Sequence, residues 1–85
     1  GGVAREITPL RCRWARSDGA GERIVAVTAA GMMLIDARSG QVRPLVSACG
    51  EEARPCFSPD GRSVIYAHPD EDGWRQIVLV HLDEE

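Results

Sequence analysis

The 85-residue chain has an ordinary globular composition, with 44% hydrophobic and 27% charged residues. Its net charge of −3 argues against a nucleic-acid partner or an anionic membrane surface, and no apolar run approaches the roughly 20 residues of a membrane span. The first residues lack the basic-then-apolar order of a signal peptide. Because a signal peptide is removed from a mature chain, the lack of one in these residues leaves the cellular compartment undetermined.

Alternating and β-branched runs separated by turn residues predict short strands throughout and no helix, so the expected class is all-β. Pro44 has no backbone N–H to donate to a ladder, which places the strand that contains it at a sheet edge. A short alternating segment, 3–8, comes first and ends at Pro9. The predicted strands that follow it are 10–14, 23–28, 32–36, 42–46, 53–57, 64–68 and 76–82.

The clearest local signal is a hairpin turn at residues 58–61, with the sequence Ser-Pro-Asp-Gly. Proline presets φ, aspartate bonds its own backbone, and glycine accepts positive φ. Residues 12–27 resemble residues 55–67, and aligning Asp18 with Asp60 gives a spacing of 42 residues. This spacing lies within the period of about 40–45 residues that is typical of four-stranded propeller blades. The alignment makes Trp14 equivalent to Phe57. It also implies that the turn of the first unit contains an insertion that ends at Gly21.

The hairpin and the strand after it resemble the TolB-type, WD40-like (PD40) β-propeller repeat, which also occurs in the propellers of prolyl-oligopeptidase-family peptidases. The resemblance implies two four-stranded antiparallel blades in the order D-ABCD-ABC, where strand A is innermost. Residues 1–8 are then an outer strand that completes a neighbouring blade, because residues 3–8 resemble residues 41–46. Residues 9–48 form a first, degenerate blade, and residues 49–85 supply strands A to C of the second.

Two blades are too few for a closed propeller, which typically has about 4–8. We therefore expect a homo-oligomer whose N-terminal strand completes the last blade of the next chain, a head-to-tail contact that closes a ring. A six-bladed trimer is the first expectation, because six blades are common in TolB-type propellers, and an eight-bladed tetramer is the second. The alternative is that these residues are a fragment, or one chain, of a larger propeller.

Candidate site residues fall into two sets. Residues 68–75 form a long loop that carries Asp70, Glu71, Asp72 and Trp74. The carboxylates suit a cation or a basic partner, or form an ordinary solvated turn. Trp74 is a binding hot spot or, as we favour, a cover for the outer part of the blade.

The second set, Arg11, Arg13 and Arg54, lies on or beside the predicted innermost strands. In a ring these arginines recur with the symmetry and create a cationic channel for an anion or a partner's carboxylate. The alternative is ordinary pairing with nearby acidic residues, Glu6, Glu51 and Glu52.

The sequence contains three cysteines, Cys12, Cys49 and Cys56, and an odd number does not describe a disulfide framework. Buried free thiols are the favoured interpretation, and a Cys49–Cys56 bridge is the alternative. A zinc site that joins them to His68 has no recognised spacing, so no metal or cofactor is expected.

Neither Ser nor Cys occupies a recognisable nucleophile elbow, so we expect no enzymatic activity. Propellers have many unrelated functions, so the fold alone says little about the function of the protein. The expected function is an interaction scaffold for a protein or peptide. The alternatives are a self-assembling structural module and part of the substrate-gating propeller of a prolyl-oligopeptidase-like hydrolase. A periplasmic location follows from the family resemblance only.

Overall fold

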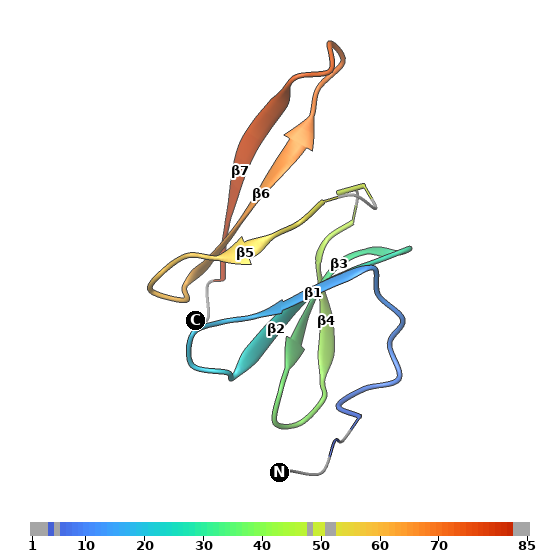
Figure 1. Ribbon diagram of the computed structural model, residues 1–85, viewed down its shortest axis with the longest axis vertical. Helices are drawn as coiled ribbons and strands as arrows, with labels where there is room; N and C mark the ends of the chain where they lie inside the picture. The colour runs from blue at the N-terminus through green and yellow to red at the C-terminus, as the bar shows by residue number, and fades with distance from the viewer. Residues whose placement is uncertain (1–3, 5, 48, 51–52, 83–85) are drawn as a thin grey trace.

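The computed structural model describes residues 4, 6–47, 49–50 and 53–82, and within these residues the protein is all-β, as predicted. The chain forms two antiparallel sheets in which each strand pairs with the next one along the chain (Figure 1). The first sheet contains β1 (Trp14–Ser17), β2 (Arg23–Thr28), β3 (Gly31–Asp36) and β4 (Val42–Val46). The second sheet contains β5 (Cys56–Phe57), β6 (Ser63–Pro69) and β7 (Arg75–His81).

Most predicted strands are present with small changes of boundary, but the strand predicted at 53–57 is reduced to the two residues of β5, and the strand predicted at 10–14 is misplaced. Strand β1 begins at Trp14, which pairs with Val27, and continues to Ser17, which pairs with Ile24. Pairing with β2 therefore uses residues 15–17, which lie between the strands predicted at 10–14 and 23–28. Strand β4 lies at the sheet edge, as Pro44 predicts, beside an irregularity in the register of β3.

The N-terminal segment lies beside its own sheet. Figure 1 shows the chain before β1 passing on the β4 side of the first sheet, from near the β3–β4 turn to the start of β1. In that turn, a Cβ atom at Gly40 would lie 2.6 Å from the carbonyl oxygen of Ile7. Residues 4 and 6–8 form no strand here. The rest of the predicted outer strand, residues 1–3 and 5, lies outside the described residues.

The turns between β1 and β2 and between β5 and β6 repeat one hydrogen-bond pattern. The amide of Asp18 donates to the carbonyl of Arg23 at 3.0 Å, and the amide of Ser58 donates to the carbonyl of Ser63 at 2.8 Å. Each turn contains a glycine at the same place, with φ of 73° in the first and 74° in the second. Glycine has no Cβ atom and therefore adopts such φ angles at no steric cost. The two sheets therefore repeat with an offset of 40 residues.

This offset corrects the alignment of Asp18 with Asp60. Asp18 occupies the place of Ser58, because both side chains accept the amide of the residue five positions on. The expected insertion through Gly21 is wrong, since both turns have the same length. The expected equivalence of Trp14 and Phe57 is wrong for the same reason, and Trp14 corresponds to Arg54.

Strands β3 and β7 are equivalent as well. The amide of Ala37, after β3, donates to the carbonyl of Glu22 at 2.9 Å. The amide of Leu82, after β7, makes the same bond to the carbonyl of Arg62 at 2.8 Å. The offset for this pair of strands is 45 residues, because the β6–β7 turn is longer than the β2–β3 turn.

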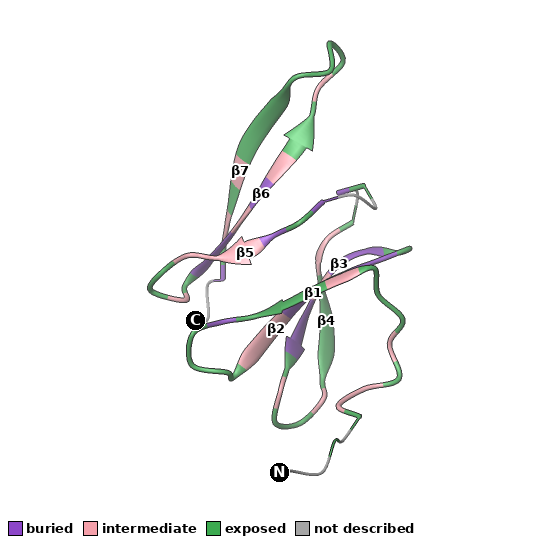
Figure 2. Ribbon diagram, in the orientation of Figure 1, coloured by how far each residue is buried: buried purple, intermediate pink, exposed green. Residues whose placement is uncertain are grey.

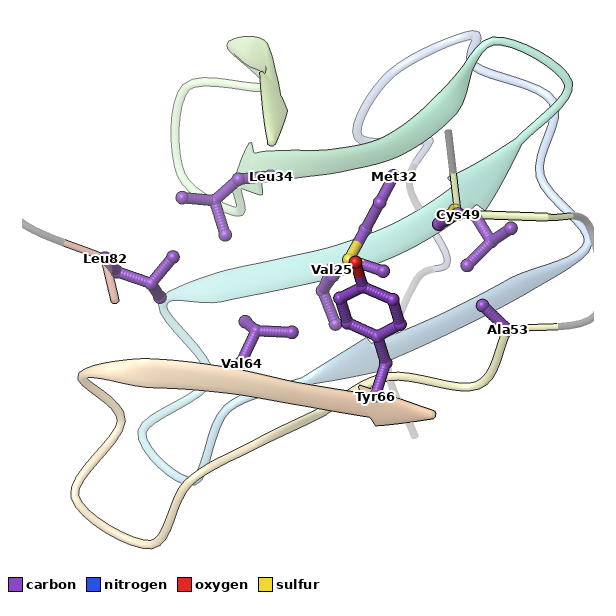
Figure 3. Close-up of a cluster of buried hydrophobic side chains, with 9 residues drawn as sticks. Val25, Met32, Leu34, Cys49, Ala53, Val64, Tyr66 and Leu82 are labelled. Atoms are coloured by element: carbon purple, nitrogen blue, oxygen red, sulfur yellow. The ribbon is translucent and has the colours of Figure 1, made fainter. Parts of the chain in front are cut away.

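The core lies between the two sheets. Alternate residues of β2 and β3 form the front face of the first sheet, and they are buried against the second sheet and the linker between the sheets (Figure 3). Each fully buried Val, Leu or Met side chain stabilises the fold by about 1.5–3 kcal/mol. The cluster comprises Val25, Val27, Met32, Leu34, Cys49, Ala53, Val64, Tyr66 and Leu82.

Asp18 connects the two turns electrostatically. Its carboxylate is buried and accepts the amide of Glu22 at 2.9 Å, and it forms an ion pair with Arg23 at 3.7 Å. Arg23 in turn donates to the carbonyl of Gly61 in the second sheet's turn. Burial raises the pKa of Asp18, but the amide hydrogen bonds and the charge of Arg23 outweigh it and leave the pKa below its ordinary value.

We predict that Asp18→Ala lowers the free energy of unfolding by about 1–3 kcal/mol, since it leaves the part-buried amides of Glu22 and Arg23 without their acceptor. The folded-state pKa is lowered, so the stability that the charge contributes is present above the unfolded value of about 3.9 and is lost as pH falls through the folded value. Asp18→Asn, which keeps an acceptor oxygen, should therefore flatten the acid-side loss of stability. Urea titrations at a series of acidic pH values measure this, and identical pH slopes for the wild type and Asp18→Asn would contradict it.

Candidate interaction surface

The arginines singled out in the sequence lie at the starting ends of β1 and β5, which run side by side (Figure 1). Arg11 and Arg13 precede β1 and are exposed, so they lie beside the strand and not within it. Arg54 precedes β5, and its guanidinium carbon lies 5.3 Å from the centroid of the Trp14 ring, a cation–π distance.

Trp14 joins this end of the first sheet to the linker. Its indole N–H donates to the carbonyl of Pro55 at 3.1 Å, and Pro55 is fully buried. The interaction with Arg54 on one side and Pro55 on the other makes Trp14 a structural residue.

The predicted acidic set lies in the turn between β6 and β7. The carboxylate of Asp70 accepts the amides of Asp72 at 2.9 Å and Trp74 at 3.0 Å, and the amide of Asp70 donates to the carbonyl of Trp74 at 2.7 Å. Asp70 therefore holds the turn closed, as an aspartate commonly does.

The acidic turn also borders a shallow, open hollow of about 640 Å³, lined by His68, Pro69, Asp70, Glu71 and Asp72. Within the residues that the structure describes, no three His, Cys, Asp or Glu side chains are arranged to hold a metal ion. The geometry of the turn thus supplies no cluster of ligands for the cation that the sequence allowed.

Trp74 was expected to cover the outer part of the blade, but it does not. Its side chain is 75% exposed, because the β6–β7 hairpin projects beyond the first sheet (Figures 1 and 2). On the same hairpin Ile77 and Leu79 are 73% and 49% exposed. The hairpin therefore presents apolar side chains to solvent.

Ser63 and His81, two residue types common in active sites, lie close together, and their proximity was not predicted from the sequence. Ser63 Oγ lies 3.3 Å from His81 Nδ1, and the two residues face each other across β6 and β7. Arg23 and Asp36 are paired at the same place in the first sheet. Because Ser63 is buried and occupies a cross-strand position, the contact serves pairing of the strands. The register of the β6–β7 hairpin is the signal that would have revealed it.

The cysteines are free thiols, so the alternative of a Cys49–Cys56 bridge does not hold in this structure. Cys49 is buried in the core, as expected for a free thiol, and burial raises its pKa. Cys56 is half-buried, whereas Cys12 is exposed, contrary to the expectation of buried thiols.

Comparison of the chain with protein-family models, with curated proteins and with solved structures gives no match. Among the described residues there is also no helix with the length and apolar character needed to cross a bilayer.

We predict that the two tryptophans differ sharply in their contribution to stability. Trp14→Phe removes the hydrogen bond to Pro55 and should lower the free energy of unfolding by about 1–2 kcal/mol. Trp74→Phe is the matched control and should change it by less than about 0.5 kcal/mol, because the side chain is exposed. Urea unfolding followed by circular dichroism compares them, and equal losses would contradict the role given to Trp14.

Proposed function

We propose that the chain is a non-catalytic β-propeller module of the TolB-type, WD40-like class that assembles head-to-tail into a ring and serves as an interaction scaffold. In this proposal each sheet is one blade. The observation that supports it most strongly is the internal repeat, in which two successive antiparallel sheets share one hydrogen-bond pattern and pack through apolar faces. Radial repetition of such sheets is the way propellers are built.

The second sheet offers a site for another strand. In the first sheet β4 pairs with the far side of β3, but within the described residues no strand pairs with the far side of the equivalent β7. Residues 3–8 resemble the β4 region in sequence. The corresponding segment of a second copy can add to β7 through main-chain hydrogen bonds, which is a common mode of recognition at a sheet edge.

Such a contact is heterologous, because the donor and acceptor surfaces differ, and it closes a ring when the rotation allows. For this exchange the N-terminal segment leaves its place beside β4 and reaches the neighbour, as in domain swapping. A trimer of six blades is the favoured ring, and a tetramer of eight blades is the second candidate.

The ring would bring the site residues together by symmetry. Arg11, Arg13 and Arg54 stand at one end of the innermost strands, so their copies surround the central axis at that end and attract an anion or a partner's carboxylate. The acidic β6–β7 turns carry the opposite charge. A protein or peptide with mixed charge is therefore the ligand class that this scaffold suits.

A second candidate function follows from the family resemblance alone. The chain would then be part of the propeller that selects substrates for a prolyl-oligopeptidase-like hydrolase. Such a part has its remaining blades elsewhere in the same protein, and the isolated 85 residues would not form a ring.

The mass in solution distinguishes these functions. We predict about 28 kDa by multi-angle light scattering, which is three copies of the 9.2 kDa chain, with about 37 kDa for the tetramer. A folded monomer at all concentrations would overturn the ring.

Removal of residues 1–8 tests the strand exchange separately. We predict that the shortened chain keeps its circular dichroism spectrum but dissociates, and that a synthetic peptide of residues 1–8 binds to it. Retention of the full ring mass without these residues would show that the N-terminal strand is not the joint.

A further inference from the structure

The chain contains three Asp-Gly sequences, which start at Asp18, Asp60 and Asp72. An Asp-Gly peptide is prone to isomerise without an enzyme, because glycine has no side chain to hinder attack of its amide nitrogen on the preceding carboxyl group. In a folded protein the reaction requires that this carboxyl group can move. Asp18 is buried and its carboxylate accepts the amides of Glu22 and Arg23, so only the other two sites are open to solvent.

Asp60 and Asp72 occupy the same place in the same kind of turn. Each is the third residue of a four-residue turn, 58–61 or 70–73, in which the amide of the glycine donates to the carbonyl of the first residue. The glycine φ is 74° in the first turn and 87° in the second. Both aspartates are exposed. Their position and exposure alone would therefore predict equal reactivity.

The carboxylate of Asp60 is held in place. It accepts the hydroxyl of Ser58 at 2.6 Å and the amide of Arg62 at 2.9 Å. These two hydrogen bonds, the one from Ser58 first, hold the pKa of Asp60 below its ordinary value, which disfavours the protonated form that cyclises. The main chain is also fixed, since the carbonyl of Gly61 accepts a hydrogen bond from Arg23.

The carboxylate of Asp72 lacks these partners, because Asp70 stands where the other turn has Ser58. The Asp70 carboxylate itself accepts the amides of Asp72 at 2.9 Å and Trp74 at 3.0 Å, and it has no proton to donate. Within the part of the chain that the structure describes, no hydrogen bond or ion pair holds the Asp72 carboxylate. A Cβ atom at Gly73 would meet nothing within 4 Å, so the peptide has room to move.

The amide of the attacking glycine is also held less closely in the second turn. It lies 3.2 Å from its acceptor at Gly73, compared with 2.9 Å at Gly61. Both groups that must meet are thus freer at Asp72 than at Asp60.

We propose that Asp72-Gly73 is a site of spontaneous isomerisation to isoaspartate and that the fold protects Asp60-Gly61. The amide nitrogen of Gly73 attacks the side-chain carbonyl carbon of the protonated Asp72. A C–N bond forms, and the carboxyl hydroxyl leaves with the amide proton as water. Water then adds to the cyclic imide. Opening at the main-chain carbonyl gives isoaspartate, whereas opening at the side-chain carbonyl restores aspartate.

The product changes the tip of the β6–β7 hairpin. Its main chain runs through Cβ and is one atom longer, in a turn that is closed by the 2.7 Å hydrogen bond from the amide of Asp70 to the carbonyl of Trp74. The longer turn should break this bond and loosen the pairing of Pro69 with Arg75. Isomerisation at this place does not depend on the proposed ring.

Prolonged incubation of the wild-type chain at mildly acidic pH tests the proposal. Trypsin cuts after Arg62 and Arg75, so Asp60 and Asp72 fall in different peptides, and electron-transfer fragmentation distinguishes isoaspartate from aspartate. Because cyclisation of Asp60 must break hydrogen bonds to a charged group, we expect isoaspartate to form about tenfold or more faster at Asp72. Equal rates at the two positions, or no isoaspartate at Asp72, would overturn the proposal.

Unfolding in urea is the matched control, because it removes both turns and keeps the sequence. In the unfolded chain we expect Asp60 and Asp72 to isomerise at similar rates. A preference for Asp72 that is unchanged in urea would show that the neighbouring sequence, and not the turn, decides between the sites.

Two substitutions exchange the restraint between the turns. Asp70→Ser gives Asp72 the hydroxyl donor that Asp60 has and should slow isomerisation at Asp72 several-fold. Ser58→Ala removes the donor from Asp60 and should raise isomerisation there. Circular dichroism verifies that each variant is folded, and unchanged rates in both folded variants would contradict the role assigned to the first residue of the turn.

Discussion

The packing of the first sheet's front face on the second sheet is the contact on which the fold depends. It buries the side chains at the centre of both sheets, and it brings together the turns that Asp18, Arg23 and Gly61 connect. An 85-residue chain buries a smaller share of its surface than a larger one, so loss of this contact would leave two sheets without a core. The linker contributes through Cys49, Ala53 and Pro55, which are buried where the chain crosses from one sheet to the other.

The same contact leaves one apolar surface of the second sheet exposed. Strands β6 and β7 carry apolar residues on both faces, and the internal contact covers only the face that includes Val64, Tyr66, Val78 and Val80. An exposed apolar face and an unpaired strand edge both promote association, and among the described residues the β6–β7 hairpin has both.

Several features could be predicted from the residues because each depends on local chemistry. Proline excludes β4 from the sheet interior, glycine marks the turns, and alternating side chains mark the strands. The all-β class is confirmed on this basis. The candidate site was harder to predict, because exposure depends on what another element covers. Trp74 was expected to cover the blade, and it lies in solvent since the hairpin outreaches the first sheet.

The register of the repeat was misread for a specific reason. Two Asp-Gly pairs attracted the alignment, whereas the turn requires an acceptor at its first position, and Asp and Ser both supply one. Matching residue types therefore gave an offset of 42 residues, and matching hydrogen-bond roles gives 40. The start of β1 was misplaced with it. The contact of Ser63 with His81 could not be foreseen without the β6–β7 register.

Amide hydrogen exchange along β7 tests the central claim of strand-completed, head-to-tail assembly most directly. Alternate amides of an edge strand point away from its only neighbour and exchange freely, whereas an added strand bonds them. The account predicts that, in the wild-type protein at high concentration, the outward amides of β7 are protected as strongly as those bonded to β6. It also predicts that this protection disappears on dilution. Rapid exchange of the outward amides at every concentration would contradict the account.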